Sequence, residues 1–173
     1  MSAVLSTCGT FRYRLDRECG LIPSEYDEDG KVFAYFGINP STADATVDDA
    51  TVRKWTGFTE RNGGSRFIVG NVFSYRATDV KELDRANRAH QLVQGPDHWP
   101  HIFDIIAEAD ILVPCWGRSK KVDRNLRPLV GMLLDYLLGS GKPVKHFGLT
   151  DGGDPKHPLF LPYETELRPW GER

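Results

Sequence analysis

The chain has 173 residues, a length typical of one domain with its own hydrophobic core. Its formal net charge of −2 excludes a strong whole-molecule attraction to nucleic acid, so any basic site must be local. Three cysteines without paired spacing argue against a disulfide framework or a zinc ribbon, and no segment approaches the roughly twenty apolar residues of a membrane span.

We therefore expect a cytoplasmic protein with no membrane segment, because the amino terminus also lacks the continuous apolar run of a signal peptide. We expect a single α/β domain over residues 1–173. Within it, residues 1–30 form an N-terminal strand and turn, and residues 31–170 form the core.

The first part of the chain predicts two strands and a helix. Residues 11–17 alternate apolar and charged side chains, which is typical of a half-exposed edge strand. A turn at residues 26–30 leads into residues 32–36, an unbroken apolar run typical of a strand buried on both faces, as in a parallel sheet. After a polar loop, Ala50–Arg61 has apolar residues at helical spacing, and the following Asn62-Gly63-Gly64 ends the helix.

The rest of the chain continues this alternation of strands with helices. A short helix is expected after residue 79, and residues 84–100 are expected to form a polar surface excursion with some helix. The other expected elements are buried strands at residues 67–73, 111–117 and 144–149, and helices at 99–109 and 122–138. This order predicts an α/β three-layer sandwich with a central, mostly parallel sheet of about four or five strands.

Polar and aromatic residues follow the expected strands at their exits. Each has an ordinary structural explanation as a cap, core residue or loop residue. Because the carboxyl ends of parallel strands meet at one edge, however, these exits should converge on one cleft. The exits are Gly37-Ile38-Asn39-Pro40, Asn71 with Phe73, Trp116-Gly117, and His157-Pro158.

Several of these motifs resemble the uracil-DNA glycosylase superfamily. Gly37-Ile38-Asn39-Pro40 looks like the first motif of its mismatch-specific branch, and Asn71 occupies the place of the asparagine that reads the base edge. His157-Pro158-Leu159 resembles the second signature, a His-Pro-Ser that opens the loop pressed into DNA. Ser41 replaces the glycine after the first motif and Leu159 replaces that serine, so uracil itself is not the expected substrate.

The wider pattern, over about residues 32–170, resembles a bacterial and phage family catalogued as domain of unknown function 1643. Its shared features include NPSTADA with the following Asp-Asp, and a late Thr-Asp-Gly before His-Pro-Leu. Together the resemblances imply a uracil-DNA glycosylase-like fold. They also imply an enzyme that cleaves the N-glycosidic bond of a modified or mismatched base in DNA.

The residue types suit that chemistry, which builds positive charge on the sugar and negative charge on the departing base. A carboxylate near the sugar stabilises that cation or accepts the proton of the attacking water. The expected catalytic residues are Asn39 to hold the water, Asp48 as the carboxylate (with Asp44 and Asp49 as alternatives), and His157 to stabilise the base. The expected base-binding residues are Asn71, which offers a donor and an acceptor, and the aromatic residues Phe36, Phe73 and Trp116.

Further contacts to the loop or to phosphates are expected from Ser41, Thr42, Asp44, Arg118, Lys120, Lys121 and Lys156. The basic residues after the third strand should lie at the start of the helix over residues 122–138, facing phosphates. We expect DNA, or a nucleotide or nucleoside, as the partner of a monomer, with no cofactor and no metal. The pair His98 and His101 lacks a third ligand nearby.

Two other functions fit the same pattern. One is a transferase or hydrolase that remodels a base substituent, and the other is a catalytically silent nucleic-acid or nucleotide binder. The acidic pair before the helix at Ala50–Arg61 has a predicted division of roles. Asp49 caps the helix and pairs with Arg53, while Asp48 points towards the cleft.

Overall fold

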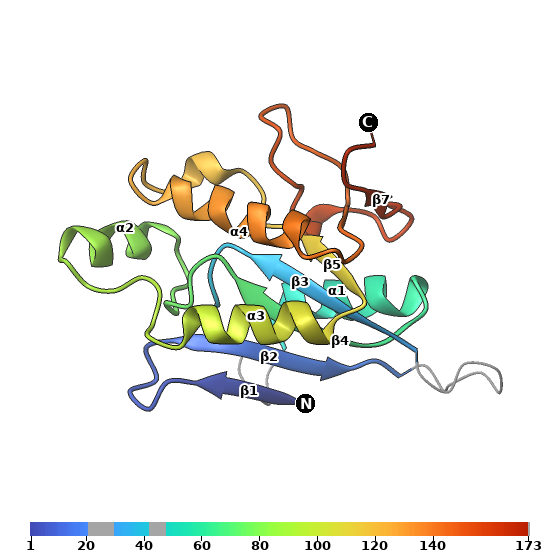
Figure 1. Cartoon of the computed structure of the whole chain (residues 1–173), viewed down its shortest axis with the longest axis horizontal. Helices are drawn as coiled ribbons and strands as arrows, with labels where there is room; N and C mark the ends of the chain where they lie inside the picture. Colours follow the sequence, from blue (N-terminus) through green and yellow to red (C-terminus); the bar gives the residue numbers. More distant parts are fainter. Residues whose placement is uncertain (21–29, 42–47, 173) are drawn as a thin grey trace.

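The computed structural model describes residues 1–20, 30–41 and 48–172. At its centre lies a five-stranded sheet in the order β1-β2-β4-β3-β5 (Figure 1). The strands are β1 (Ser2–Leu5), β2 (Arg12–Glu18), β3 (Lys31–Gly37), β4 (Gly64–Asn71) and β5 (Ile111–Pro114). A separate two-stranded sheet pairs β6 (Lys145–His146) with β7 (Arg168–Pro169).

The five-stranded sheet is mixed. β3 pairs in parallel with both β4 and β5, whereas β1 pairs with β2, and β2 with β4, in antiparallel fashion. The α/β class is therefore confirmed, but the prediction of a mostly parallel sheet is wrong. Apolar alternation indicates a strand without indicating its direction, and β2 runs opposite to β4.

The predicted edge position of β2 is also wrong, because β1 covers its outer side. Tyr13, Leu15 and Arg17 of β2 are all buried. The expected fourth buried strand is reduced to the two residues of β6, and Val144 joins β5 through a single parallel bridge to Leu112. Gly148, with a φ of 95°, interrupts any extension of that strand.

The helices are α1 (Ala50–Arg61), α2 (Lys81–Arg88), α3 (His98–Glu108) and α4 (Arg127–Gly139), with two 3₁₀ turns, η1 (Ser119–Lys121) and η2 (Pro158–Phe160). The predicted bounds of α1 are confirmed, and α3 agrees within one residue at each end.

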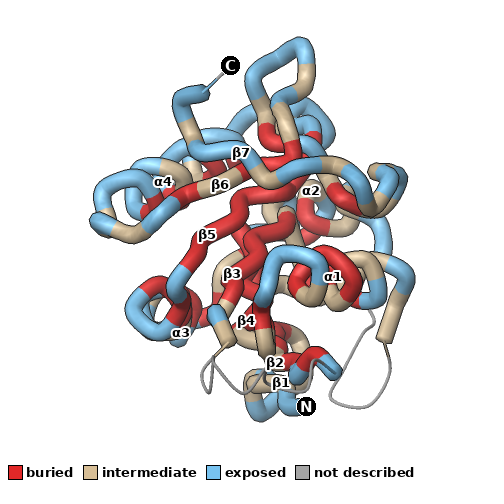
Figure 2. The backbone as a smooth tube through the Cα atoms, turned by 90° about the vertical axis from the view of Figure 1, so that its right-hand side faces the viewer, coloured by how far each residue is buried: buried red, intermediate tan, exposed pale blue. Residues whose placement is uncertain are grey.

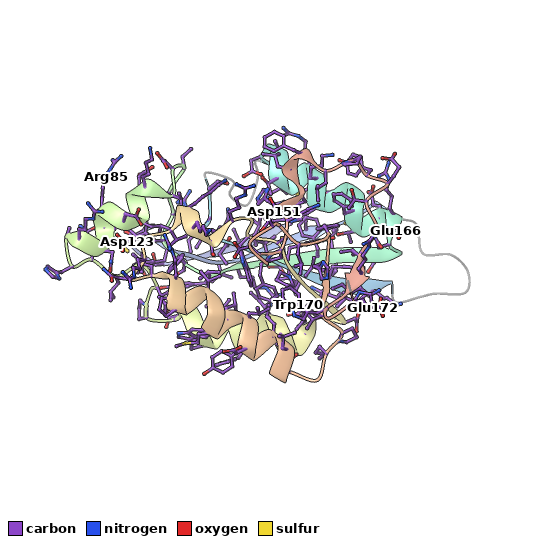
Figure 3. The ribbon with its side chains drawn as sticks, turned by 90° about the horizontal axis from the view of Figure 1, so that it is seen from above. Arg85, Asp123, Asp151, Glu166, Trp170 and Glu172 are labelled. Atoms are coloured by element: carbon purple, nitrogen blue, oxygen red, sulfur yellow. The ribbon has the colours of Figure 1, made fainter. Side chains whose placement is uncertain are left out.

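The helix expected from residue 122 begins only at Arg127, with Pro128 in its first turn. Residues 122–126 extend towards α2, where the backbone N–H of Asp123 donates to Asp84 Oδ1 at 3.0 Å. Figure 3 shows Asp123 at the same end of the molecule as Arg85 of α2.

Helices cover both faces of the sheet. On one face, α1 packs Trp55 and Phe58 with Tyr35 of β3 and with Phe147. On the other face, α3 and α4 cover Phe36 and Ala34. Figure 2 shows the buried strands lying between α1 on one side and α3 and α4 on the other.

Some predictions concern residues that lie outside the described ranges. These are most of the turn at residues 26–30, and Thr42 and Asp44 of the polar loop. None of the helices in the described ranges is both long and apolar enough to cross a membrane.

Candidate active site

The carboxyl ends of the three parallel strands lie side by side. Gly37 of β3 is in register with Asn71 of β4, and Phe36 is in register with Pro114 of β5. The pairing continues past the strands, because the backbone N–H of Phe73 donates to the carbonyl of Ile38 at 2.8 Å. The exit loops of β3 and β4 therefore run together, as predicted.

A cavity of about 160 Å³, which we call the inner cavity, opens at this edge. Five of the predicted site residues line it, from four separate parts of the chain: Asn39, Ser41, Asn71, Trp116 and His157. The remaining lining residues are Arg12, Gly37, Ile38, Asp49, Thr51, Val52, Trp55, Ala77 and Thr78.

Asn39 is held by the backbone around it. Its Nδ2 donates to the carbonyl of Ala77 at 2.7 Å and to that of Pro40 at 3.2 Å. Both amide protons are thus engaged, and Oδ1 is the atom of this side chain that remains to accept a hydrogen bond from a ligand or a water.

Asn71 and Trp116 bring polar side chains to the inner cavity. Each residue is 4% exposed. Within the described part of the chain, the Trp116 indole N–H is buried without an acceptor, and Asn71 lines the same cavity. Gly37 leaves the room for Asn71, because a Cβ at position 37 would come within 2.9 Å of Asn71 Oδ1. A buried donor normally has a partner, so the Trp116 indole is suited to bind a ligand, and the Asn71 amide lines the same space.

His157 enters the cavity from the loop before η2. Its Nδ1 accepts a hydrogen bond from the backbone N–H of Leu159 at 3.3 Å, so the neutral ring carries its proton on Nε2. Burial lowers the pKa of His157, and the charge of Lys121 lowers it further, while Asp49 acts in the opposite direction. His157 is therefore a neutral hydrogen-bond donor at neutral pH.

The backbone of Gly117 supports the position of His157. Gly117 has a φ of 75°, and a Cβ there would lie 3.3 Å from the Cβ of His157. A glycine at the exit of β5 thus allows the His157 loop to approach the strand end closely.

The acidic pair before α1 is arranged differently from the prediction. Asp49 caps the helix as expected, since its Oδ1 accepts from the backbone N–H groups of Thr51 and Val52, each at 2.8 Å. Its Oδ2 accepts a hydrogen bond from the hydroxyl of Ser41. Asp49 also lines the inner cavity.

Asp48 does not line the inner cavity, so the expectation that it points towards the cleft is wrong. Its Oδ1 accepts from Nε of Arg17 at 2.7 Å, and Arg17 is only 1% exposed. The expected pairing of Arg53 with Asp49 is wrong as well, because Arg53 donates to the backbone carbonyl of Asp48 at 2.7 Å. The carboxylate that the sequence predicted to be catalytic is therefore paired with a buried arginine of β2.

Phe36 and Phe73 do not line the inner cavity. Both are fully buried in the hydrophobic core, so neither is placed to stack on a base in that cavity. A strand buried on both faces turns its aromatic side chains into the core.

Arg118, Lys120 and Lys121 are exposed, and they precede the start of α4 at Arg127 by at least six residues. Lys121 lines a second cavity, the outer cavity, of about 590 Å³. Arg118, Lys120 and Lys156 line neither cavity.

The outer cavity adjoins the inner one. The two share Ile38, Asn39, Thr78, Trp116 and His157, and the outer cavity adds Asp79, Val80, Lys81 and Lys121. It is therefore bordered by the start of α2 and the end of η1.

Sequence reasoning missed Arg12, which lines the inner cavity and is 3% exposed. Because β2 is antiparallel to β4, the amino end of β2 lies at the carboxyl edge, where the backbone N–H of Arg12 donates to the carbonyl of Ser74 at 2.9 Å. Finding it required the direction of β2. Thr51 and Trp55 were also missed, although their helix was predicted to begin beside the polar loop.

The fold and the cavities define an α/β protein with a small polar hollow at the carboxyl edge of its parallel strands. The chain belongs to the family described as protein of unknown function (DUF1643), which matches residues 12–159. No curated protein and no solved structure matches it. Among the described residues, no group of three or more His, Cys, Asp or Glu side chains is placed to hold a metal ion.

Proposed function

We propose that this chain is an enzyme that cleaves the N-glycosidic bond of a modified or mismatched nucleobase, on a scaffold like that of the uracil-DNA glycosylases. The substrate is DNA or a nucleotide. The observation that carries the proposal is the inner cavity, where the amide of Asn71 lies with Asn39 and His157 around a space of about 160 Å³.

The size of the inner cavity matches one aromatic ring. A cavity of about 150 Å³ engineered in another protein binds benzene, whereas drug-sized ligands occupy about 300–1,000 Å³. The lining here is polar as well as apolar, which suits a pyrimidine-sized base better than a hydrocarbon.

Each polar group has a role in this reaction. Asn71 hydrogen-bonds to the base edge with its amide donor and acceptor, and Asn39 Oδ1 holds the attacking water. As the bond between C1′ and the base nitrogen breaks, its electron pair leaves with the base. The Nε2–H of His157 then stabilises the developing charge by hydrogen bonding.

Asp49 replaces Asp48 as the proposed carboxylate, because Asp49 lines the inner cavity and Asp48 pairs with Arg17. In this role Asp49 stabilises the cationic sugar and accepts the proton of the water as its oxygen bonds to C1′.

The test is to incubate the protein with DNA and nucleotides that carry uracil, hydroxymethyl or glycosylated pyrimidines, and to measure released base and abasic sites. Asn71→Ala and His157→Ala should each lower base release by about 10²-fold, the effect of removing one such donor. Lys120→Ala, an exposed change outside both cavities, is the matched control. Absence of base release from the whole panel would contradict the proposal.

A second candidate function is ligand binding without turnover. It is favoured by the interactions of the two carboxylates before α1, since Asp48 pairs with Arg17 and Asp49 caps α1. Tight binding of a nucleotide that is recovered unchanged, with no release of base, would select this function.

A further inference from the structure

Two lysines line the outer cavity. Lys81 is the first residue of α2 and Lys121 the last residue of η1. Within the described ranges, neither ammonium group forms a salt bridge or a hydrogen bond. Asp79 is the carboxylate that lines this cavity, and its Oδ1 accepts from the backbone N–H of Lys81 at 3.0 Å. The outer cavity is therefore suited to an anion.

The junction between the cavities carries an unsatisfied donor. Trp116 lines both cavities, is 4% exposed, and has an indole N–H without an acceptor among the described residues. A buried donor without a partner is costly, and an acceptor atom of a bound ligand would satisfy it. Asn39 and His157 also border both cavities, so one ligand can extend from one into the other.

We propose that the outer cavity binds the phosphate of the nucleotide whose base occupies the inner cavity, with Lys81 and Lys121 as its charged partners. This inference rests on the proposed function for the inner cavity. The sugar then lies at the junction beside Asn39 and His157, where the glycosidic bond is cleaved.

The charge of the chain favours a free nucleoside monophosphate over a DNA strand as the source of this phosphate. The formal net charge is −2 and the isoelectric point is about 6.2, whereas proteins that neutralise many phosphates carry a strongly basic face. Among the described basic residues after β5, Lys121 is the one that lines the outer cavity. The guanidinium of Arg127 donates instead to the backbone carbonyls of Val122 and Lys120.

The test is isothermal titration of the full chain with deoxynucleosides, with their 5′- and 3′-monophosphates, and with a single-stranded oligonucleotide of the same bases. A monophosphate should bind at least about tenfold more tightly than its nucleoside, which corresponds to about 1.4 kcal/mol. The double variant Lys81→Ala/Lys121→Ala should lose this preference while keeping the affinity for the nucleoside. The control Lys120→Ala should keep both.

Equal binding of nucleoside and monophosphate, no binding of either, or an unchanged preference in the double variant would overturn the phosphate site. Tighter binding of the oligonucleotide than of every monophosphate would overturn the choice of a free nucleotide. Base release is measured on the same samples. Lysine-dependent binding without base release contradicts the proposed function alone, and base release without any phosphate preference contradicts this inference alone.

Discussion

Replacing Asp48 with alanine should mainly destabilise the protein. The change removes the carboxylate that accepts from Nε of Arg17 at 2.7 Å, and Arg17 is 1% exposed. Breaking a fully buried ion pair costs about 3–5 kcal/mol, and one hydrogen bond to a charged group contributes about 1.5–3 kcal/mol. Asp48 itself is 28% exposed, and Arg17 keeps its hydrogen bond to the carbonyl of Asp16 at 2.9 Å. The lower range therefore applies, and we expect a loss of about 2–3 kcal/mol.

The assay is thermal unfolding followed by circular dichroism, with base release measured below the transition. For a chain of this length, a loss of about 2–3 kcal/mol lowers the melting temperature by roughly 4–12 °C. Below its melting transition the Asp48→Ala variant should retain its base-release activity, because Asp48 does not line the inner cavity.

Asp49 provides the matched comparison. Asp49→Asn keeps an oxygen to accept from the N–H groups of Thr51 and Val52, so its stability should change little while base release falls. Asp49→Ala should lose about 1 kcal/mol of capping energy as well as activity. If Asp48→Ala melts within 1 °C of the parent, or if Asp49→Asn is fully active, this assignment of the two carboxylates is refuted.

Two further changes test the site and the core. Gly37→Ala should lower base release with little loss of stability, because the added Cβ would lie 2.9 Å from Asn71 Oδ1 and would push that side chain aside. Gly131→Ala is the control and should leave activity unchanged, because its Cβ would meet no atom within 4 Å. Burial lowers the pKa of His98 from 6.5 to about 4, with a smaller effect of His101. The unfolded chain then binds this proton first, so the stability present above about pH 6.5 should fall by about 3 kcal/mol as the pH drops to about 4. Urea unfolding at both pH values should show this loss in the parent but not in His98→Gln, and an equal loss in both would contradict it.

The sequence predicted best where local signals determine the structure. The bounds of α1 follow from a capping aspartate, a helical spacing of apolar residues and the Asn62-Gly63-Gly64 stop, all of which act within a few residues. The convergence of Asn39, Asn71 and Trp116 was also predictable, because the parallel strands β3, β4 and β5 bring their carboxyl ends to one edge. His157 reaches the same cavity from the loop before η2 and not from a parallel strand.

The sequence predicted poorly where partners are distant in the chain. The direction of β2 depends on pairing with β4 about fifty residues later, so neither the mixed sheet nor Arg12 in the cavity was evident. The partner of Asp48 is Arg17, thirty-one residues earlier, and no local pattern marks that pair. Phe36 and Phe73 were assigned to the site because they lie close in sequence to its polar residues, but both side chains pack into the hydrophobic core.

Because β2 runs antiparallel to β4, the inner cavity forms only late in folding. Its lining begins at Arg12 and ends at His157, so its wall closes only after segments from nearly the whole chain have found one another. Such long-range closure is slow and entropically demanding compared with the formation of α1 or α4. A ligand seated there binds only the fully assembled fold, and its binding energy therefore stabilises every element of the chain at once.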